Sequence, residues 1–348
     1  MSLQNLLGTR LPIIQAPMAG VQDSRLALAV CGAGALGSVP AAMLGADALR
    51  AELQIMSEQS AGPWNVNFFC HTPPEPDAER EERWREALAP WYREMGLDLA
   101  DVRAGGGRRP FDAQVLEILR EFKPPVISFH FGLPDAELVA ELKRWGTVVL
   151  SSATTVAEAR WLESRGVDAV IAQGLEAGGH RGMFLSEDVT TQVGTLALLP
   201  QVVAAVGVPV IAAGGIADAA GISAAMALGA SGVQIGTAFL LCPEATTSQV
   251  HRAALASEAA AHTTLTNVFS GRPARGIVNR VIRELGPMSP LAPEFPLAGT
   301  AITPLRKAAE SQGSGDFSPL WSGQNASGCR AIPAADLVGQ LTGIARPE

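Results

Sequence analysis

The sequence predicts an α/β fold in which eight parallel strands close into a (β/α)8 barrel, the TIM barrel. The first observation behind this prediction is a set of short apolar runs, too apolar to alternate and too short to be helices. Strands buried on both faces of a parallel sheet have this composition. The second observation is that segments with helical spacing separate the runs. The eight runs are Leu11–Ile14, Ala35–Val39, Trp64–Phe68, Val126–Phe129, Val148–Leu150, Ala169–Ala172, Val208–Ala212 and Gly232–Ile235.

The helical segments carry signals at their ends. Ala219–Leu228 is preceded by Asp218, whose side chain can cap a helix, and followed by Gly229, which can adopt the left-handed backbone that ends one. Similar signals frame two other segments, Asp135–Trp145 before Gly146, and Thr155–Arg165 between Thr154 and Gly166. Eight strand–helix repeats favour a closed barrel. An open doubly wound sheet remains the alternative, because counting strands from one sequence is error-prone.

The repeat stops after Leu241. Residues 243–318 contain helical pieces, Ser248–His262 and Thr303–Ser311, and a proline-rich stretch, but no apolar strand. We expect residues 1–242 and 319–348 to form the barrel, with its last helix at Ala334–Gly343. Residues 243–318 are expected to form a smaller helical or irregular insertion domain after strand 8. Such an insertion lies at the mouth where a barrel's active site is found, so it can form a wall or a lid.

The composition narrows the class of protein. Hydrophobic residues make up 47 % of the 348 residues and charged ones 17 %, which provides enough apolar material for one large core. The formal net charge of −8 argues against a nucleic-acid partner, because neutralising phosphates needs a basic face. No leader segment, long apolar span, CxxC pair or cluster of metal ligands is visible. We therefore expect a cytoplasmic protein with reduced cysteines, no membrane partner and no metal.

Two glycine-containing turns follow the last two predicted strands. Gly214 and Gly215 end the seventh strand, and Gln234-Ile235-Gly236-Thr237 ends the eighth. Glycines there let a phosphate approach the backbone so that successive N–H groups point at its oxygens, and the Thr237 hydroxyl can add a donor. Barrels often bind phosphate at this place. One such turn is explained by chain geometry alone, but two in adjacent units favour a phosphate site.

A third glycine-rich turn follows the sixth predicted strand. Gln173 ends that strand, and Gly178-Gly179-His180-Arg181 comes shortly after it. The turn brings an amide, an imidazole and a guanidinium to the barrel mouth. A histidine at such a place can hydrogen-bond an anion or take a proton near neutral pH. We therefore predict that His180 is functional rather than structural, with Arg181 beside it.

Three other strand ends offer candidate residues. Ala16-Pro17-Met18 follows the first strand, where Pro17 fixes the backbone and makes the turn rigid. Asn67 offers an amide near the end of the third strand. His130 ends the fourth, where it either faces the pocket as a substrate contact or is buried scaffold.

Several of these stretches belong to motifs of a known family. They are Gln15–Gly20, Ser128–Pro134, Glu176–Gly182, Ala213–Ile216, Gln234–Phe239, Phe269–Gly276 and Trp321–Gln324. From Leu11 to about Gly328 the chain resembles the nitronate monooxygenases, formerly called 2-nitropropane dioxygenases. The Phe-His-Phe-Gly-Leu-Pro stretch within Ser128–Pro134 points to their class I bacterial members, whereas the Glu-Ala-Gly-Gly-His stretch is shared with related flavin barrels.

The resemblance implies an FMN-binding barrel with a smaller, mostly helical domain. The enzyme would oxidise alkyl nitronates with O2 to a carbonyl compound and nitrite, and propionate 3-nitronate, a metabolic poison, is the family's usual substrate. The protein would then act on small molecules, as a monomer or homodimer, in detoxification. His180 would be the catalytic residue, and His130, His180 and Arg181 are the expected substrate contacts.

The resemblance also implies a set of FMN contacts. Met18, Asn67, Gln173 and Gly178 would contact the flavin ring or ribityl chain, Gly215 and Gln234–Thr237 would hold the phosphate, and Gln324 would close over the flavin. The expected cofactor-binding set is completed by Ala16, Pro17, Gly179, Gly214 and Trp321.

Three other functions remain open. An NAD(P)H-dependent flavin reductase, acting on quinones or enoyl thioesters, uses the same barrel and the same histidine loop. A non-catalytic flavin carrier or sensor would bind FMN and turn nothing over. A flavin-free isomerase or aldolase is less favoured, because no lysine lies in these motifs to form a Schiff base.

Overall fold

Eight parallel strands form the centre of the molecule. The computed structural model describes residues 2–75, 77–102 and 108–343. The sheet order is β1-β9-β8-β6-β5-β4-β3-β2, and a parallel bridge between Ile14 and Leu36 joins β1 to the segment that leads into β2. The sheet is therefore a closed barrel, which confirms the predicted fold and excludes the open doubly wound sheet. The strands are β1 (Ile13–Gln15), β2 (Gly37–Pro40), β3 (Trp64–Phe69), β4 (Val126–His130), β5 (Val148–Ala153), β6 (Ala169–Gln173), β8 (Val210–Ala213) and β9 (Gly232–Ile235).

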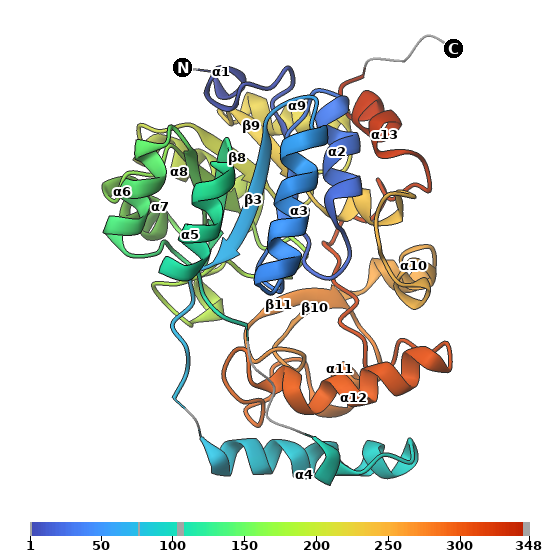
Figure 1. The fold of residues 1–348 in the computed structure, drawn as a ribbon. Helices are drawn as coiled ribbons and strands as arrows, with labels where there is room; N and C mark the ends of the chain where they lie inside the picture. Colours follow the sequence, from blue (N-terminus) through green and yellow to red (C-terminus); the bar gives the residue numbers. More distant parts are fainter. Residues whose placement is uncertain (1, 76, 103–107, 344–348) are drawn as a thin grey trace.

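Helices surround this barrel (Figure 1). The short helix α1 (Leu3–Leu7) lies at the end from which the strands start, and buries Leu3 and Leu7 in the same apolar cluster as Ile14 and Ile211. The last helix, α13 (Ala334–Leu341), contacts α2 and so completes the outer layer, as predicted. The remaining outer helices are α2 (Ser24–Gly32), α3 (Ala46–Gln59), α5 (Ala113–Phe122), α6 (Ala136–Arg144), α7 (Val156–Ser164), α8 (Thr195–Ala205) and α9 (Ala219–Ala227).

The helix ends follow the predicted signals with one correction. The Asp218 side chain accepts from the Gly221 N–H and caps α9, and Gly229 has a φ of +96° at the end of that helix. Gly146 and Gly166 also have positive φ after α6 and α7. The cap of α7 is Thr155, one residue later than predicted, because the Thr154 hydroxyl is bound to the buried Glu158 carboxylate instead.

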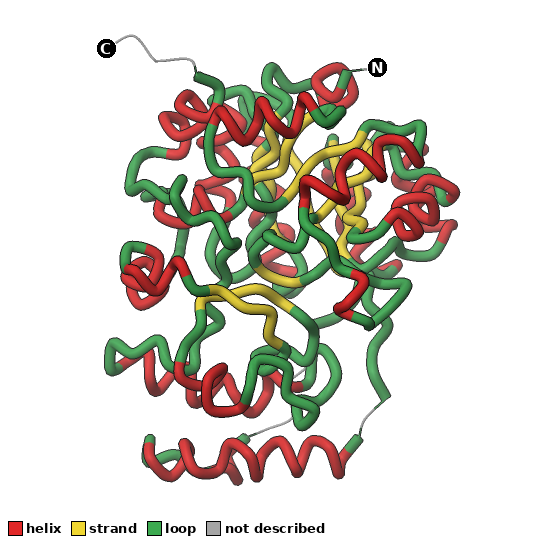
Figure 2. The backbone as a smooth tube through the Cα atoms, turned by 180° about the vertical axis from the view of Figure 1, so that it is seen from behind, coloured by secondary structure: helices red, strands yellow, loops and turns green. Residues whose placement is uncertain are grey.

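Residues 243–318 contain a small sheet that the sequence did not predict. Strands β10 (Thr263–Thr266) and β11 (Ala274–Ile277) are antiparallel, and β11 also pairs with β7 (Gly179–His180) from the barrel. Three of the four residues of β10 are threonines, and β11 has an arginine and a glycine at its centre, so neither resembles the apolar runs of a buried strand. Figures 1 and 2 show this sheet between the barrel and two helices of the segment, α11 (Arg280–Leu285) and α12 (Ala298–Ser311). The third helix, α10 (Gln249–Leu255), lies to one side of the sheet in Figure 1.

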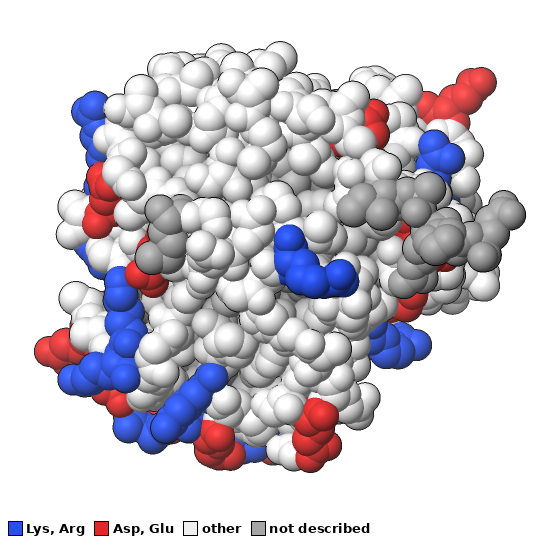
Figure 3. All heavy atoms as spheres, turned by 90° about the horizontal axis from the view of Figure 1, so that it is seen from above, with Lys and Arg blue, Asp and Glu red and all other residues white. Residues whose placement is uncertain are grey.

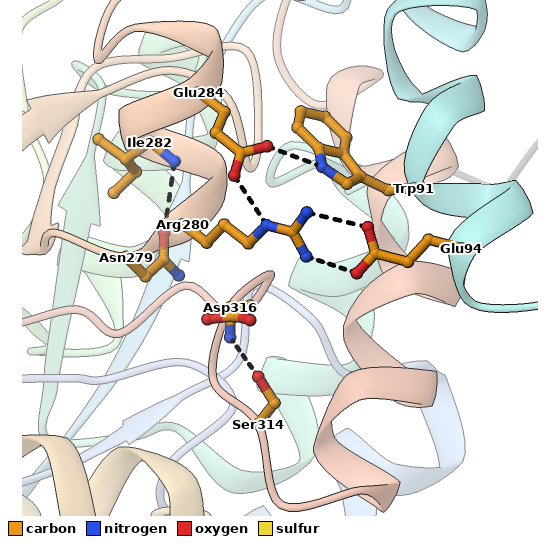
Figure 4. Close-up of polar contacts among 8 residues, drawn as sticks. All are labelled: Trp91, Glu94, Asn279, Arg280, Ile282, Glu284, Ser314 and Asp316. Atoms are coloured by element: carbon orange, nitrogen blue, oxygen red, sulfur yellow. Dashed lines mark hydrogen bonds and ion pairs between the residues drawn. The ribbon is translucent and has the colours of Figure 1, made fainter.

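Helix α4 (Ala78–Glu94) packs on this smaller domain, although it lies between β3 and α5 in the chain. Trp84, fully buried, donates from its indole N–H to the Ala298 carbonyl at the start of α12. At the other end of α4, Arg280 of α11 bridges Glu94 and Glu284 (Figure 4). We therefore propose that the smaller domain comprises α4 together with residues 243–318.

The face of the barrel remote from the smaller domain is mostly uncharged. In Figure 3, most basic and acidic side chains lie dispersed near its edges, with both signs present, and one basic side chain lies near its middle. Within the described residues no helix has both the length and the apolar character needed to cross a membrane.

Candidate active site

One large cavity lies at the carboxyl ends of the barrel strands, where β7 and the smaller domain meet the barrel. This is the end at which barrel enzymes carry their active sites. The cavity brings together most of the residues predicted from the sequence: Ala16, Pro17, Met18, Asn67, His130, Gln173, Gly178, Gly179, His180, Gly214, Gly215, Gln234, Ile235, Gly236, Thr237 and Trp321 line it. Arg181 and Gln324 do not.

The loops after β8 and β9 carry backbone donors and glycines of the kind that suit an anion. Gly214 and Gly215 have φ of +115° and +73°, a backbone that side chains strongly disfavour. Among the described residues, the N–H groups of Gly215 and Gly236 have no acceptor. The Thr237 hydroxyl oxygen accepts from the Gly323 N–H at 2.9 Å, so its hydrogen is left for another acceptor. Free backbone donors converging on glycine turns are the usual means of binding phosphate.

A segment near the C-terminus holds these loops in place. The Asn325 amide donates to the Gly215 carbonyl at 2.9 Å, and the Cys329 thiol donates to the Thr237 carbonyl at 3.0 Å. Gln324 binds the Glu176 carbonyl through its backbone N–H, while its side chain is exposed. The neighbouring Asn325 thus lines the cavity where Gln324 was predicted to. No sequence signal separates these adjacent amides, because the choice depends on how the turn is oriented.

The amide side chains in the cavity differ in which of their hydrogen-bonding atoms already have protein partners. Gln173 donates to the His180 carbonyl and accepts from the Gly182 N–H, so it holds the loop that carries His180. Asn67 uses its amide N–H groups on Ser128. Gln234, in contrast, keeps a buried side-chain oxygen with no partner among the described residues. An orphaned buried oxygen is costly, which indicates that a ligand donates to it.

His180 lies in β7, among aromatic rings. Its Nε2 lies 2.8 Å from the Ser270 Oγ, and the rings of Phe69, Phe295 and Trp321 surround the imidazole. Burial lowers the His180 pKa well below its ordinary value, and the positive charges of Arg108 and other neighbouring cations act in the same direction. The imidazole is therefore neutral at pH 7. A neutral imidazole can donate one hydrogen bond and can accept a proton.

His130 lines the cavity, and both of its ring nitrogens have protein partners. Its Nε2 lies 3.2 Å from the His180 carbonyl and its Nδ1 3.1 Å from the Ser152 Oγ. A carbonyl only accepts, so the proton is on Nε2 and Ser152 donates to Nδ1. Burial lowers the His130 pKa to about 4. These contacts make His130 a support for the His180 backbone; its predicted contact with substrate stays a prediction.

The position of Arg181 revises the expectation that it meets the substrate. Its side chain is fully buried. The guanidinium donates to the carbonyls of Gln173 and Gly174 and to the Gln192 side chain. Its donors are thus directed at the scaffold, behind the loop that carries His180. We do not retain a substrate role for this residue.

Four residues around His180 were missed by the sequence analysis. Ser270 and Phe295 come from the smaller domain, Phe69 ends β3, and Arg108 lies between β3 and α5. Ser270 lies in a family motif, but its hydroxyl had no visible target in the sequence. The others have no local signal, since contacts between the barrel and a separate domain depend on tertiary structure.

The cysteines and acidic residues suggest no other chemistry. Cys31, Cys70, Cys242 and Cys329 are all free thiols. Within the described part of the chain, no group of three histidine, cysteine or acidic side chains is placed to hold a metal ion.

A barrel with glycine turns after its last two strands and a neutral histidine in the same cavity is an architecture typical of flavin-dependent oxidoreductases. Residues 1–343 match the family model described as nitronate monooxygenase, and the chain belongs to this family of flavoenzymes. It is therefore an oxidoreductase.

Relatives and solved structures match over nearly the whole chain. A nitronate monooxygenase of Paraburkholderia phytofirmans is 44 % identical over 98 % of this chain and 93 % of its own length. That of Pseudomonas aeruginosa is 44 % identical, covering 97 % and 96 %. The structure of a nitroalkane oxidase from Streptomyces ansochromogenes has a TM-score of 0.90 at 42 % identity, covering 99 % of this chain and 97 % of that one. FabK from Thermotoga maritima has a TM-score of 0.74 at 27 % identity, covering 99 % and 96 %.

Proposed function

We propose that this protein binds FMN and oxidises alkyl nitronates with O2, giving a carbonyl compound and nitrite. The observation that carries the proposal is that a single cavity joins the glycine turns after β8 and β9 to the neutral His180. A flavin ring extending from those turns would lie within reach of a small molecule held by the histidine.

The residues present fit FMN. The N–H groups of Gly215 and Gly236 and the hydroxyl of Thr237 would hold its phosphate, and the orphaned oxygen of Gln234 would accept a hydrogen bond from a hydroxyl or ring N–H group of FMN. Glu176, the one acidic residue lining the cavity among those described, is turned away from this role, because its carboxylate accepts from the N–H and hydroxyl of Thr195. When bound, FMN supplies the electron transfer that links a nitronate to O2.

The chain's own task is to hold the anion and keep water from it. A nitronate already carries its negative charge on the nitro oxygens, so no proton has to be removed before it reacts. The His180 imidazole donates a hydrogen bond to those oxygens, and the surrounding aromatic rings exclude water and strengthen that bond. A neutral nitroalkane would first lose a proton, which His180 would accept on Nδ1 in its other neutral tautomer, where Nε2 carries the proton and donates to the Ser270 hydroxyl; in the nitronate complex Ser270 donates to Nε2 and Nδ1 carries the proton.

The nearest rival is an NAD(P)H-dependent flavin reductase. Likeness to FabK-type reductases supports it less, since the nitroalkane oxidase structure matches with both a higher TM-score and a higher identity. The two functions differ in their electron donor, and this difference is easily measured.

The deciding experiment is oxygen uptake by the FMN-loaded protein with propionate 3-nitronate and no reduced nicotinamide. We expect rapid uptake together with nitrite release. If a fully loaded preparation consumes no oxygen but its flavin is bleached by NADH under anaerobic conditions, the reductase is correct instead.

A further inference from the structure

Arg108 is a cation in the wall of the cavity, with no carboxylate partner among the described residues. Among the described residues that line the cavity it is the one arginine or lysine, and the one carboxylate there, Glu176, is already bound to Thr195. No acceptor for the Arg108 guanidinium is found within the described residues. The other arginines near His180 differ, since Arg181 and Arg272 donate to backbone carbonyls.

The protein fixes the position of this guanidinium. The His71 Nε2 donates to the Arg108 carbonyl at 2.9 Å, which anchors its backbone. The guanidinium lies over the Phe295 ring, with its central carbon 5.4 Å from the ring centroid. The His71 ring packs edge-on against the same Phe295 ring, at 4.8 Å between centroids. Arg108 is thus held by two side chains that themselves support each other.

Burial lowers the pKa of Arg108 to about 10, and the charge of Arg306 acts in the same direction. The side chain therefore keeps its charge at neutral pH. Holding a charged, partly buried guanidinium without acceptors is unfavourable, and an anion entering the cavity would relieve that cost. Guanidinium groups bind carboxylates particularly well, because two parallel N–H donors match the two oxygens.

Arg108 and His180 contact the same aromatic ring, and the charge of Arg108 also acts on the pKa of His180. The His180 ring centroid also lies 5.4 Å from the centroid of Phe295, so the imidazole and the guanidinium flank the same ring. We propose that Arg108 binds a carboxylate at the far end of the nitronate substrate, while His180 binds the nitronate end. This inference rests on the proposed function, which it deepens by identifying the residue that selects carboxylate-bearing nitronates.

The test compares two nitronates with the same number of carbon atoms. Propionate 3-nitronate carries the carboxylate and propyl 1-nitronate does not. For Arg108→Met we expect kcat/KM to fall about ten- to hundredfold with the carboxylate substrate, mainly through KM, and to change less than about threefold with the other. Arg108→Lys keeps the charge but not the paired donors, so its kcat/KM with the carboxylate substrate should lie between those of the wild type and Arg108→Met.

Arg109→Met is the matched control, because Arg109 is an exposed neighbour paired with Asp112. It should leave both substrates unaffected. Equal losses on both nitronates in Arg108→Met, or no loss on the carboxylate substrate, would overturn the inference.

A binding measurement separates this inference from the proposed function. Under anaerobic conditions, equilibrium dialysis of the FMN-loaded protein with 3-nitropropionate reports carboxylate binding without turnover. Weaker binding by Arg108→Met, with wild-type affinity in Arg109→Met, supports the inference even if the wild type oxidises neither nitronate. Equal binding by all three proteins counts against Arg108 whatever the enzyme's reaction is.

Discussion

The Nε2 of His180 lies 2.8 Å from the Oγ of Ser270, and this hydrogen bond connects the barrel to the smaller domain. His180 lies in β7, which pairs with β11 of that domain, and Ser270 lies in the turn just before β11. The ring orientation of the histidine therefore depends on residues outside the barrel. Since Gln173 and His130 both bind the His180 carbonyl, the backbone and the ring of this residue are fixed independently.

The first prediction concerns this orientation. Ser270→Ala removes the partner of the His180 ring and leaves the backbone contacts in place. A neutral hydrogen bond contributes about 0.5–1.5 kcal/mol, so we expect kcat/KM for nitronates to fall about two- to tenfold, with flavin content unchanged. Steady-state oxygen uptake and the absorbance of the bound flavin measure the two quantities. Normal activity in this variant would mean that Ser270 does not orient the ring.

A second prediction separates the two roles of His180. His180→Asn keeps a side chain that can donate a hydrogen bond but cannot act as a base near neutral pH. Turnover of a nitronate should weaken modestly, whereas turnover of the corresponding neutral nitroalkane should be abolished. Oxygen uptake with each form, added separately, gives the comparison. A similar loss on both would contradict separate roles.

The barrel could be predicted from the sequence because its strands are buried on both faces. The run Val126–Phe129 is buried at every position, so apolar composition alone reveals it. Strand β10 has three threonines, partly or fully buried against a neighbouring strand, and offers no such signal. Helix α4 is rich in charged residues, which gives no signal of a domain contact; the buried Trp84, Trp91 and Tyr92 explain its packing.

Some residues of the candidate site could likewise be predicted from the sequence, and others could not. Glycines and amides at strand ends were predictable, because a closed barrel brings all these ends to one rim. The roles of Arg181 and Arg108 were not, since both are arginines near glycines in the sequence and only the structure shows what each side chain contacts. Arg181 is directed at buried carbonyls, whereas Arg108 is held at the cavity by contacts with His71 and Phe295. These contacts join segments that lie far apart in the chain.

The third prediction is a loss of stability in mild acid. Burial lowers the pKa of both His130 and His251 to about 4, whereas an unfolded histidine has a pKa near 6.5. The unfolded chain therefore binds protons first, and the free energy of unfolding falls as the pH drops from about 6.5 toward 4. At pH 5 each of these two histidines should lower the free energy of unfolding by on the order of 1–2 kcal/mol. Urea unfolding at pH 7.5 and pH 5 measures this difference, and equal stability at the two values would argue against neutral, buried histidines.

The last prediction tests the proposed phosphate site. Gly215→Asp places a carboxylate beside the N–H groups that would hold the FMN phosphate, at a residue whose φ is +73°. Repulsion between the two anions should expel FMN, so that the protein purifies colourless while remaining folded. Gly215→Ala separates strain from charge: an added Cβ would meet only the Glu176 side chain, at 3.5 Å, so this variant should keep at least part of its flavin.

Gly313→Asp controls for an aspartate at positive φ elsewhere. Gly313 has a φ of +77°, and no atom lies within 4 Å of an added Cβ there. This variant should therefore bind FMN as the wild type does. Flavin absorbance per folded protein, with folding checked by circular dichroism, compares the three variants. A yellow Gly215→Asp protein would mean that the phosphate is held elsewhere, because a carboxylate at this turn leaves no room for a second anion on the same N–H groups.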